Sequence, residues 1–283
     1  MIQLHGKRAL VKIEWGINDG RAAAAVIPTA DTNQNRVQSL IAELDSNGVD
    51  SLCVEDKLPE FRFARSMNRG IEELLKHGKI RCIVLSNDDI SDIKGMADML
   101  QIVAQNQNIY ARPHTNGENS ACIVTTSRLK LIWNYSVAKK APFYAFRIVN
   151  GLNWYGKHHL AVTAPTFKWK SGSFVNVQPF GVFNAAVFRD NKFDENFQNG
   201  IEDLELGYRL MLAGVKGMAR PEWNVRHGGS SSFKEARNLV KNCIGSYSPS
   251  DQELIRGFEY FWEKHFSGAD PSVISDTRER KVI

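Results

Sequence analysis

The stretch AAAAVIPTADTNQNRVQSLIAELDSNGVDSLCVED, residues 22–56, decides the fold that this sequence predicts. It opens on AAAAVIP, an apolar run that is typical of a strand covered on both faces of a sheet. A helix follows, because apolar residues recur there at helical spacing, namely Val37, Leu40, Ile41 and Leu44. Asn47-Gly48 ends this helix, and SLCVED is typical of a second short buried strand, which finishes in two acids.

The same alternation of strand and helix continues along the chain. Residues 63–77 have helical spacing and stop at Gly78, and residues 80–85 form a third apolar strand. Strands that alternate with helices predict a parallel sheet with crossover helices. Weaker patterns predict further elements, namely strands at 8–15, 121–126 and 128–133, a helix near 93–105, a strand or strand–turn–strand at 180–189, a helix from Glu202 to Gly214, and C-terminal helices.

Length and composition predict one large α/β domain over residues 1–283. The chain has 283 residues, of which 43% are hydrophobic, and this is enough for a full core. Its start lacks the apolar run of a signal peptide, and no stretch approaches the ~18 consecutive apolar residues of a membrane span. The cysteines lie far apart, without a C-x-x-C pair. We therefore expect a cytoplasmic protein with no transmembrane segment.

Polar or turn-forming residues end the three predicted strands: Pro28-Thr29, Glu55-Asp56 and Asn87-Asp88-Asp89. Because ligands collect beyond the carboxyl ends of parallel strands, we expect these ends to share one ligand-binding edge. The chain has neither the G-x-G-x-x-G dinucleotide fingerprint nor a P-loop. Acids at strand ends also cap helices and form turns, so Asn87-Asp88-Asp89 alone leaves both interpretations open.

Several motifs then follow in order: N-D-D at residues 87–89, G-V-F-N-A-A-V-F-R at 181–189, F-D-E-N-F at 193–197, E-D-L-E-L-G-Y-R-L at 202–210, and a lone histidine, His227. In this order they resemble the GT-A glycosyltransferases, and more narrowly the inverting glycosyltransferase family 2. Three further segments are similar to parts of that family, namely V-I-P-T at 26–29, A-R-S-M-N-R-G at 64–70 and F-W-E-K-H-F-S-G at 261–268. The resemblance covers about residues 22–117 and 180–266.

The resemblance implies a GT-A fold, in which a mostly parallel, Rossmann-like sheet is flanked by helices. Residues 22–117 would form the nucleotide-sugar-binding half, 118–179 a basic aromatic insertion, and 180–266 the acceptor and catalytic half with C-terminal helices. The activity that it implies is metal-dependent, inverting transfer of a sugar from a nucleoside-diphosphate sugar to an acceptor hydroxyl. UDP is the expected nucleotide.

The resemblance also implies a role for each matching residue. Asp89 and His227 are the expected ligands of Mn²⁺ or Mg²⁺, which would neutralise the diphosphate leaving group. The expected nucleotide-sugar contacts are Pro28, Thr29, Glu55, Asp56, Arg65, Asn68, Asp88 and Gly181. Within that set Asp56, with Glu55 as its alternate, would bind the nucleobase and Asp88 the ribose. Asp203 is the expected general base, and Glu202 would orient the acceptor or cap the helix.

Each of these residues also has an ordinary structural interpretation that the sequence leaves open. His227 could be a loop histidine held by backbone groups, and Asp203 could simply complement the dipole of its helix. Arg65 could form a surface ion pair of little energetic weight, and Asn68 could be a residue on a helix surface.

Residues 119–189 carry a one-sided charge. They include nine Lys and Arg residues but no Asp or Glu, and aromatic residues are dense from 133 to 169. A field of one sign attracts polyanions, and aromatic rings stack on sugars or bases. We therefore expect an anionic acceptor, either a surface or lipid-linked glycan or hydroxymethylated bases of DNA modified by a bacteriophage enzyme. Protein is a third candidate.

Two other classes of protein compete with this hypothesis. A nucleotidyltransferase on a similar fold would release pyrophosphate, and the Glu202-Asp203 motif argues against it because that motif would serve an acceptor hydroxyl. A non-catalytic relative would bind glycan or nucleic acid through the basic segment. The presence of both acid motifs, Asn87-Asp88-Asp89 and Glu202-Asp203, argues against a non-catalytic relative.

Overall fold

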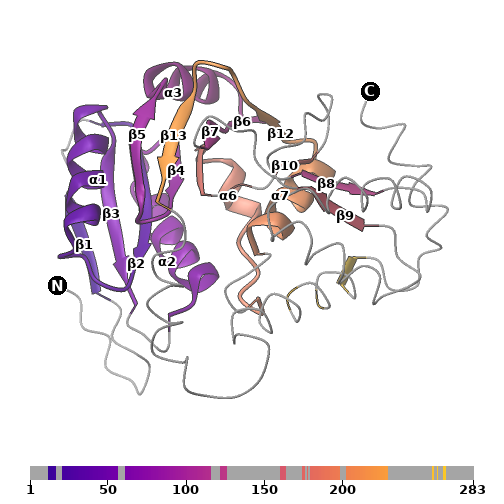
Figure 1. Ribbon diagram of the computed structural model, residues 1–283, viewed down its shortest axis with the longest axis horizontal. Coiled ribbons are helices and arrows are strands. Elements are labelled where there is room, and N and C mark those ends of the chain that lie inside the picture. The colour runs from indigo at the N-terminus through magenta and orange to yellow at the C-terminus, as the bar shows by residue number, and fades with distance from the viewer. Residues whose placement is uncertain are drawn as a thin grey trace.

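The computed structural model describes residues 12–16, 21–56, 61–115, 122–125, 160–163, 174–175, 177, 179–197, 202–228, 257, 260, 264 and 265. Within this part of the chain, a central sheet is covered by helices on both faces and accompanied by two smaller sheets (Figure 1). The predicted strand at 128–133 and most of the basic aromatic segment 118–179 lie outside the described residues.

The central sheet has seven strands. In order across the sheet they are β1 (Lys12–Gly16), β3 (Asp50–Glu55), β2 (Ala23–Thr29), β4 (Cys82–Ser86), β11 (Phe180–Asn184), β6 (Ile109–Ala111) and β12 (Lys216–Met218). β2 is parallel to β3 and β4, and β6 to β12, whereas β1 and β11 pair antiparallel with their neighbours. All strands except β1 and β11 therefore share one direction, so the predicted α/β class with a mostly parallel sheet is confirmed.

The chain changes the direction of its path across the sheet at β2. After β2, helix α1 (Asn35–Ser46) leads to β3, which is the neighbour of β2 on one side within the sheet. Helix α2 (Phe63–Lys76) then leads from β3 to β4, which is the neighbour of β2 on the other side. The carboxyl ends of β2 and β4 therefore flank the point where the strand order reverses. In open α/β sheets, ligands bind at such a switch point.

Helices cover both faces of the sheet, and this explains the unbroken apolar run of β2. Ala23, Ala25 and Ile27 pack in one core cluster with residues of α1 and of α3 (Met96–Gln105). Ala24 and Val26 belong to a second cluster, with residues of α2 and of α7 (Glu202–Leu212). Because side chains alternate along a strand, a strand buried on both faces needs apolar residues at every position.

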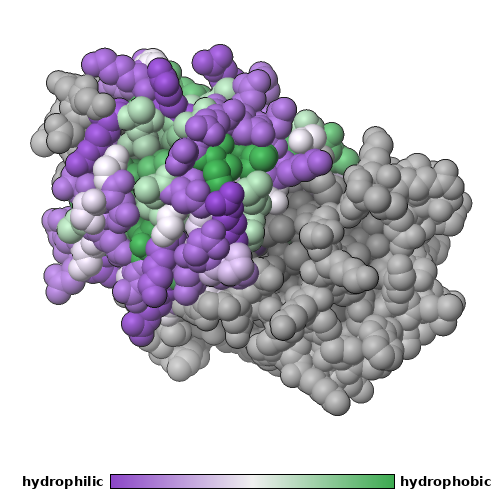
Figure 2. All heavy atoms as spheres, turned by 90° about the horizontal axis from the view of Figure 1, so that it is seen from above, coloured by the Kyte–Doolittle hydropathy of each residue, from purple (hydrophilic) through white to green (hydrophobic). Residues whose placement is uncertain are grey.

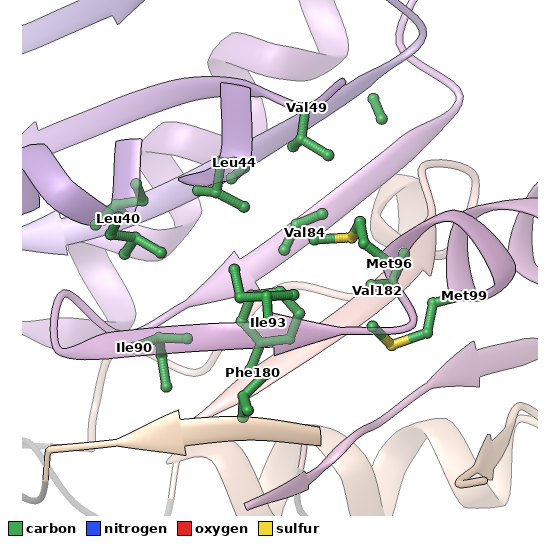
Figure 3. Close-up of a cluster of buried hydrophobic side chains, with 14 of the residues drawn as sticks. Leu40, Leu44, Val49, Val84, Ile90, Ile93, Met96, Met99, Phe180 and Val182 are labelled. Carbon is green, nitrogen blue, oxygen red and sulfur yellow. The ribbon is translucent and has the colours of Figure 1, made fainter. Parts of the chain in front are cut away.

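A second sheet brings distant segments together beside β4. Its strands are β5 (Ile90–Lys94), β13 (Asn224–His227) and β7 (His114–Thr115), and β13 runs antiparallel to β5 with His227 opposite Ile90. Figure 3 shows Ile90 and Ile93 of β5 in one core with Leu40 of α1, Met96 of α3 and Phe180 of β11. This packing holds the start of β5, and therefore residues 87–89, against the main sheet.

The remaining elements lie in the second half of the chain. A third, antiparallel sheet contains β10 (Phe174–Val175), β8 (Cys122–Thr125) and β9 (Leu160–Thr163), so the predicted strand at 121–126 is confirmed. A short helix, α6 (Val187–Asp190), follows β11. α7 begins at Glu202 as predicted, and Gly214 lies beyond its end with φ +82°, a left-handed conformation that glycine adopts without strain.

Two predictions are correct only in part, because side chains or distant strands override the local pattern. The segment 180–189 is not a strand–turn–strand, because the chain turns after Asn184, whose Oδ1 accepts a hydrogen bond from the Ala186 N–H at 3.0 Å, and continues as α6. The helix expected near 93–105 begins only at Met96. Residues 90–94 form β5 instead, since β13 pairs with them from far along the chain.

No helix in the described parts of the chain is long and apolar enough to cross a membrane. Seen from above, polar residues dominate the surface of the described part and surround a patch of apolar ones (Figure 2). Among the side chains whose exposure the structure describes, Leu212 is the one large apolar side chain that is more exposed than buried, at 57%.

Candidate functional site

Thr29, the last residue of β2, links the acids that follow the two neighbouring strands. Its hydroxyl donates a hydrogen bond to Asp88 Oδ2 at 2.9 Å. Its carbonyl oxygen accepts one from the backbone N–H of Asp56 at 3.0 Å. Thr29, Asp56 and Asp88 are all buried. The expectation that the three strand ends meet at one edge of the sheet is therefore confirmed.

Asp88 is a buried carboxylate held by two donors on one oxygen. Besides Thr29, Arg36 Nη2 lies 3.1 Å from Asp88 Oδ2. Burial raises the pKa of the Asp88 carboxyl above its ordinary value, Arg36 and the Thr29 hydroxyl lower it, and the neighbouring Asp89 raises it further. A buried acid that its partners do not fully compensate is a feature that functional sites share.

Asp56 is fully buried, and its two carboxylate oxygens differ. Oδ2 accepts hydrogen bonds from Arg65 Nη2 at 2.6 Å, from Ser66 Oγ at 3.1 Å and from the Arg62 N–H at 3.4 Å. Oδ1 is enclosed and has no hydrogen-bond partner among the described residues. An enclosed carboxylate oxygen without a donor is costly, so a ligand N–H at this position would be stabilised.

Asp89 and His227 form a pair between two strands. His227 Nε2 lies 3.1 Å from Asp89 Oδ1, and the two side chains are only 22% and 8% exposed. The backbone repeats the link, because the Gly228 N–H donates to the Asp89 carbonyl oxygen at 2.9 Å. His227 is thus a strand residue beside a carboxylate, and the interpretation of it as a loop histidine does not apply.

The fit of a divalent cation can be judged from these side chains. The described residues contain no group of three or more His, Cys, Asp or Glu side chains that could hold a metal ion. The Asn87 amide adds a third group, with Nδ2 3.4 Å from His227 Nε2, while its Oδ1 is enclosed without a partner in the described part of the chain. A half-turn of this amide exchanges the two atoms and presents an oxygen beside His227. A carboxylate and an amide oxygen fit a Mn²⁺- or Mg²⁺-type cation, and imidazole is a ligand for transition metals, so the set fits Mn²⁺ better than Mg²⁺.

Three of the expected nucleotide contacts are engaged with other protein groups. Glu55 Oε2 accepts hydrogen bonds from the Thr32 hydroxyl at 2.8 Å and the Thr32 N–H at 3.2 Å. Arg65 pairs with Asp56, which is buried and not a surface acid. Asn68 is buried rather than on a helix surface, and its amide exchanges hydrogen bonds with the backbone of Phe193 at 2.9 and 2.8 Å. Glu55 and Asn68 therefore brace the loops around the site. Pro28 lies in β2 opposite Val54, one residue before Thr29.

A short segment connects the two halves of the site. The Asn87 N–H donates to the Pro179 carbonyl oxygen at 2.9 Å, and the Val177 N–H lies 3.5 Å from the Asp203 carbonyl oxygen. Gly181, on β11, pairs with Leu85 of β4, and a Cβ added there would lie 2.8 Å from the Phe183 ring. Residues 177 and 179–181 thus link the end of β4 to the first turn of α7.

The first turn of α7 carries both expected catalytic acids. Glu202 is 6% exposed, whereas Asp203 is half-buried. Acids in a first helical turn are stabilised in their ionised form by the helix dipole.

A buried charge cluster attaches α7 to the C-terminal part of the chain. Glu205 is fully buried and binds Arg209 Nε at 2.8 Å, Lys264 Nζ at 2.7 Å and His265 Nε2 at 3.0 Å. Lys264 also contacts Asp194 at 2.7 Å. Burial would raise the pKa of Glu205, but its bonds to His265, Arg209 and Lys264 outweigh this and lower the pKa to about 2. The cluster fixes the helix that carries Asp203.

Arg36 is the residue of this site that the sequence pattern did not reveal. It is the second residue of α1, and α1 begins soon after β2 ends at the switch point. The one hint in the sequence is that a charged residue stands in the first turn of the helix that follows a buried strand. The partner, Asp88, is 52 residues away in the sequence, and no local periodicity connects the two.

No protein-family model matches this chain, and a comparison with curated proteins finds no match either. The function of the chain is therefore inferred from its own residues and their geometry.

Proposed function

We propose that this chain is a metal-dependent glycosyltransferase that moves a sugar from a nucleoside-diphosphate sugar to an acceptor hydroxyl with inversion at the anomeric carbon. The observation that carries the proposal is the meeting of buried acids around Thr29, at the carboxyl ends of β2, β3 and β4. This edge lies at the switch point of the sheet, where α/β proteins bind their ligands. The ordered motifs shared with inverting family 2 glycosyltransferases support the GT-A assignment.

The donor nucleotide would bind across Asp56 and Asp88. Asp56 Oδ1 is the free acceptor for a nucleobase N–H, since Arg65 and Ser66 already occupy Oδ2. Asp88 would take a ribose hydroxyl, with Thr29 holding the carboxylate in place. Gly181, which was expected to let the donor sugar approach, is buried instead, and the Phe183 ring and the Val177 carbonyl oxygen occupy the space beside its Cα, so the glycine serves packing.

Asp89, His227 and Asn87 would hold the cation. Mn²⁺ or Mg²⁺ would neutralise charge on the departing diphosphate. The described residues supply few ligands of their own, so the cation should bind much more tightly when a nucleoside diphosphate is present.

Asp203 would act as the general base. It would accept the proton of the acceptor hydroxyl while that oxygen attacks the anomeric carbon from the face opposite the diphosphate. The C–O bond to the diphosphate breaks as the new glycosidic bond forms, so an α-linked donor gives a β-linked product. Glu202, which is buried beside it, would orient the acceptor.

The testing experiment is a donor screen. Nucleotide sugars are incubated with the protein, with Mn²⁺ or with EDTA, and with candidate acceptors that include glycans and hydroxymethylated DNA. We expect release of a nucleoside diphosphate that EDTA abolishes. Release of pyrophosphate from nucleoside triphosphates would instead identify a nucleotidyltransferase. Failure to bind or cleave any nucleotide, together with tight polyanion binding, would identify a non-catalytic binding protein.

Asp203→Asn tests the base in the same assay. We expect it to lower turnover at least about 10²-fold while leaving donor affinity unchanged, because the amide cannot accept the proton. Asp190→Asn is the matched control, since Asp190 is an exposed acid in α6. Near-wild-type turnover of Asp203→Asn would show that the base assignment is wrong.

A further inference from the structure

Two arginines lie at the carboxyl edge of the sheet, each paired with a buried acid of the site. Arg65, from α2, contacts Asp56, and Arg36, from α1, contacts Asp88. The resemblance to known glycosyltransferases includes Arg65 but assigns nothing to Arg36. The question is whether Arg36 serves only as the counterion of Asp88.

The contacts of Arg36 leave most of its hydrogen-bonding capacity unused. Its guanidinium has five N–H donors, and one contact, from Nη2 to Asp88 Oδ2 at 3.1 Å, is made within the described residues. Nε is enclosed and has no hydrogen-bond partner in the described part of the chain. A counterion for a buried carboxylate is most effective when it binds through two parallel bonds, and Arg36 does not do so.

The position of Arg36 also suits an anionic ligand. Its side chain is 25% exposed, so the guanidinium is partly open to solvent while its partner Asp88 is 8% exposed. It lies at the switch point, between the end of β2 and the start of β5. A planar guanidinium with free donors matches the geometry of phosphate oxygens. The cation ligands nearby are few, so a second positive group would help to balance a diphosphate.

We propose that Arg36 binds the phosphate groups of the nucleotide donor, so that this site discriminates nucleoside diphosphates from nucleosides even without a metal ion. The inference rests on the proposed nucleotide-binding function and adds a residue and a selectivity to it. Asp88 holds the guanidinium in place in the free protein, and the unused donors receive the phosphate oxygens.

Titration calorimetry in EDTA tests this proposal without relying on catalysis. The probes are uridine, adenosine, cytidine, guanosine and their 5′-diphosphates. For the wild-type chain we expect at least one diphosphate to bind about tenfold or more tightly than its nucleoside. Arg36→Gln should remove most of that difference, whatever it does to nucleoside affinity through Asp88. Arg36→Lys should retain part of the difference, because lysine keeps the charge but lacks the two-pronged guanidinium.

Arg21→Gln is the matched control. Arg21 is 24% exposed and pairs with Asp45 and the buried Asp50, but it lies before β2, at the opposite end of the strands. The Arg21→Gln variant should preserve the preference for diphosphates. Circular dichroism and thermal unfolding of each variant establish that it is folded.

The outcomes distinguish an error in the assignment of Arg36 from an error in the proposed function. If the wild-type chain prefers diphosphates and Arg36→Gln still does so, the assignment of Arg36 is wrong and the nucleotide site stands. If the wild-type chain binds none of these compounds, with or without Mn²⁺, the proposed function itself is overturned. Loss of the preference in Arg36→Gln alone supports the proposal.

Discussion

At the scale of single residues, Asp88 shows how a candidate binding site is maintained at the expense of stability. Burial raises the pKa of its carboxyl, and Arg36 and Thr29 only partly oppose this effect. The charged form therefore costs more in the folded chain than in the unfolded chain. Retaining an acid under these conditions is understandable if a ligand uses it.

Asp88→Asn should therefore raise the thermal midpoint of the ligand-free protein while abolishing nucleotide binding. Because the folded-state pKa lies above the ordinary value of 3.8, the wild-type chain loses stability as pH rises from 3.8 through the folded-state pKa. The Asp88→Asn variant has no carboxyl to ionise at this position, so it does not lose stability in this way as pH rises. Thermal unfolding in EDTA at several pH values should show the two proteins diverging as pH rises. A variant that is less stable than wild type at pH 8 would contradict the argument.

Gly70 is a residue whose small size is required by packing. It lies in α2, and a Cβ there would overlap Val26 Cγ1 of β2 and lie 3.1 Å from Val54 Cγ2 of β3. Gly70→Ala should lower the free energy of unfolding by about 1–3 kcal/mol, because overpacking shifts a helix from its sheet. Urea unfolding measures this. Gly78→Ala is the control, since nothing lies within 4 Å of its Cβ position, and it should leave stability unchanged or slightly higher.

At the scale of elements, α7 depends on partners from two other parts of the chain. Glu205 binds Arg209 within the helix and Lys264 and His265 near the C-terminus, and Lys264 continues to Asp194 in the loop after α6. Tyr260 also donates to Asp194 Oδ2, at 2.9 Å. The helix that would present Asp203 is thus positioned by charges and not only by apolar packing.

Glu205→Gln should lower the free energy of unfolding by about 3 kcal/mol at pH 7, because it removes a buried carboxylate that partly buried basic side chains neutralise. The pKa of Glu205 falls from 4.5 to about 2 on folding, so its contribution is complete above pH 4.5 and disappears as pH falls towards 2. The gap between variant and wild type should close over that interval, as measured by urea unfolding at each pH. Glu73→Gln is the control, since its partner Lys76 is an exposed neighbour on α2, and no measurable change is expected. A gap that persists unchanged at pH 3 would contradict this account.

At the scale of the whole molecule, charge is unevenly distributed along the chain. The net charge is +5, and residues 119–189 contribute nine cations without an acid. If the chain transfers a sugar as proposed, a basic segment of this kind favours an anionic acceptor. Among the acceptors, duplex DNA makes the sharpest quantitative prediction, because phosphate contacts release counterions.

Duplex DNA binding should weaken steeply with salt. With six phosphates contacted, affinity should fall about 10³-fold between 50 and 200 mM salt, measured by fluorescence anisotropy. The double variant Lys139→Glu/Lys140→Glu should weaken DNA binding and reduce the slope without changing nucleotide affinity. Lys76→Glu/Lys79→Glu, on and beside α2, serves as the control. Binding that is undetectable or independent of salt would exclude DNA as the acceptor and leave a glycan or a protein.

Local sequence patterns were enough to predict the α/β class, the parallel core strands and the edge on which the acids gather. These features follow from local patterns: apolar runs, helical spacing, glycine stops and acids at strand ends are properties of neighbouring residues. That is why α1, α2, β2, β3 and β4 lie close to their expected places, and why Asp56 and Asp88 were found.

Only the tertiary structure decided which distant groups complete that edge. In the folded chain, β11 lies antiparallel beside β4, and β5 is a strand because it pairs with β13. His227 lies next to Asp89, and Arg36 contacts Asp88. Asn68 also turns inward to the backbone of Phe193. The physical reason is the same in each case. A local pattern records whether a residue prefers burial, but the partner that it meets there depends on how separate elements pack, and packing is settled by the chain as a whole.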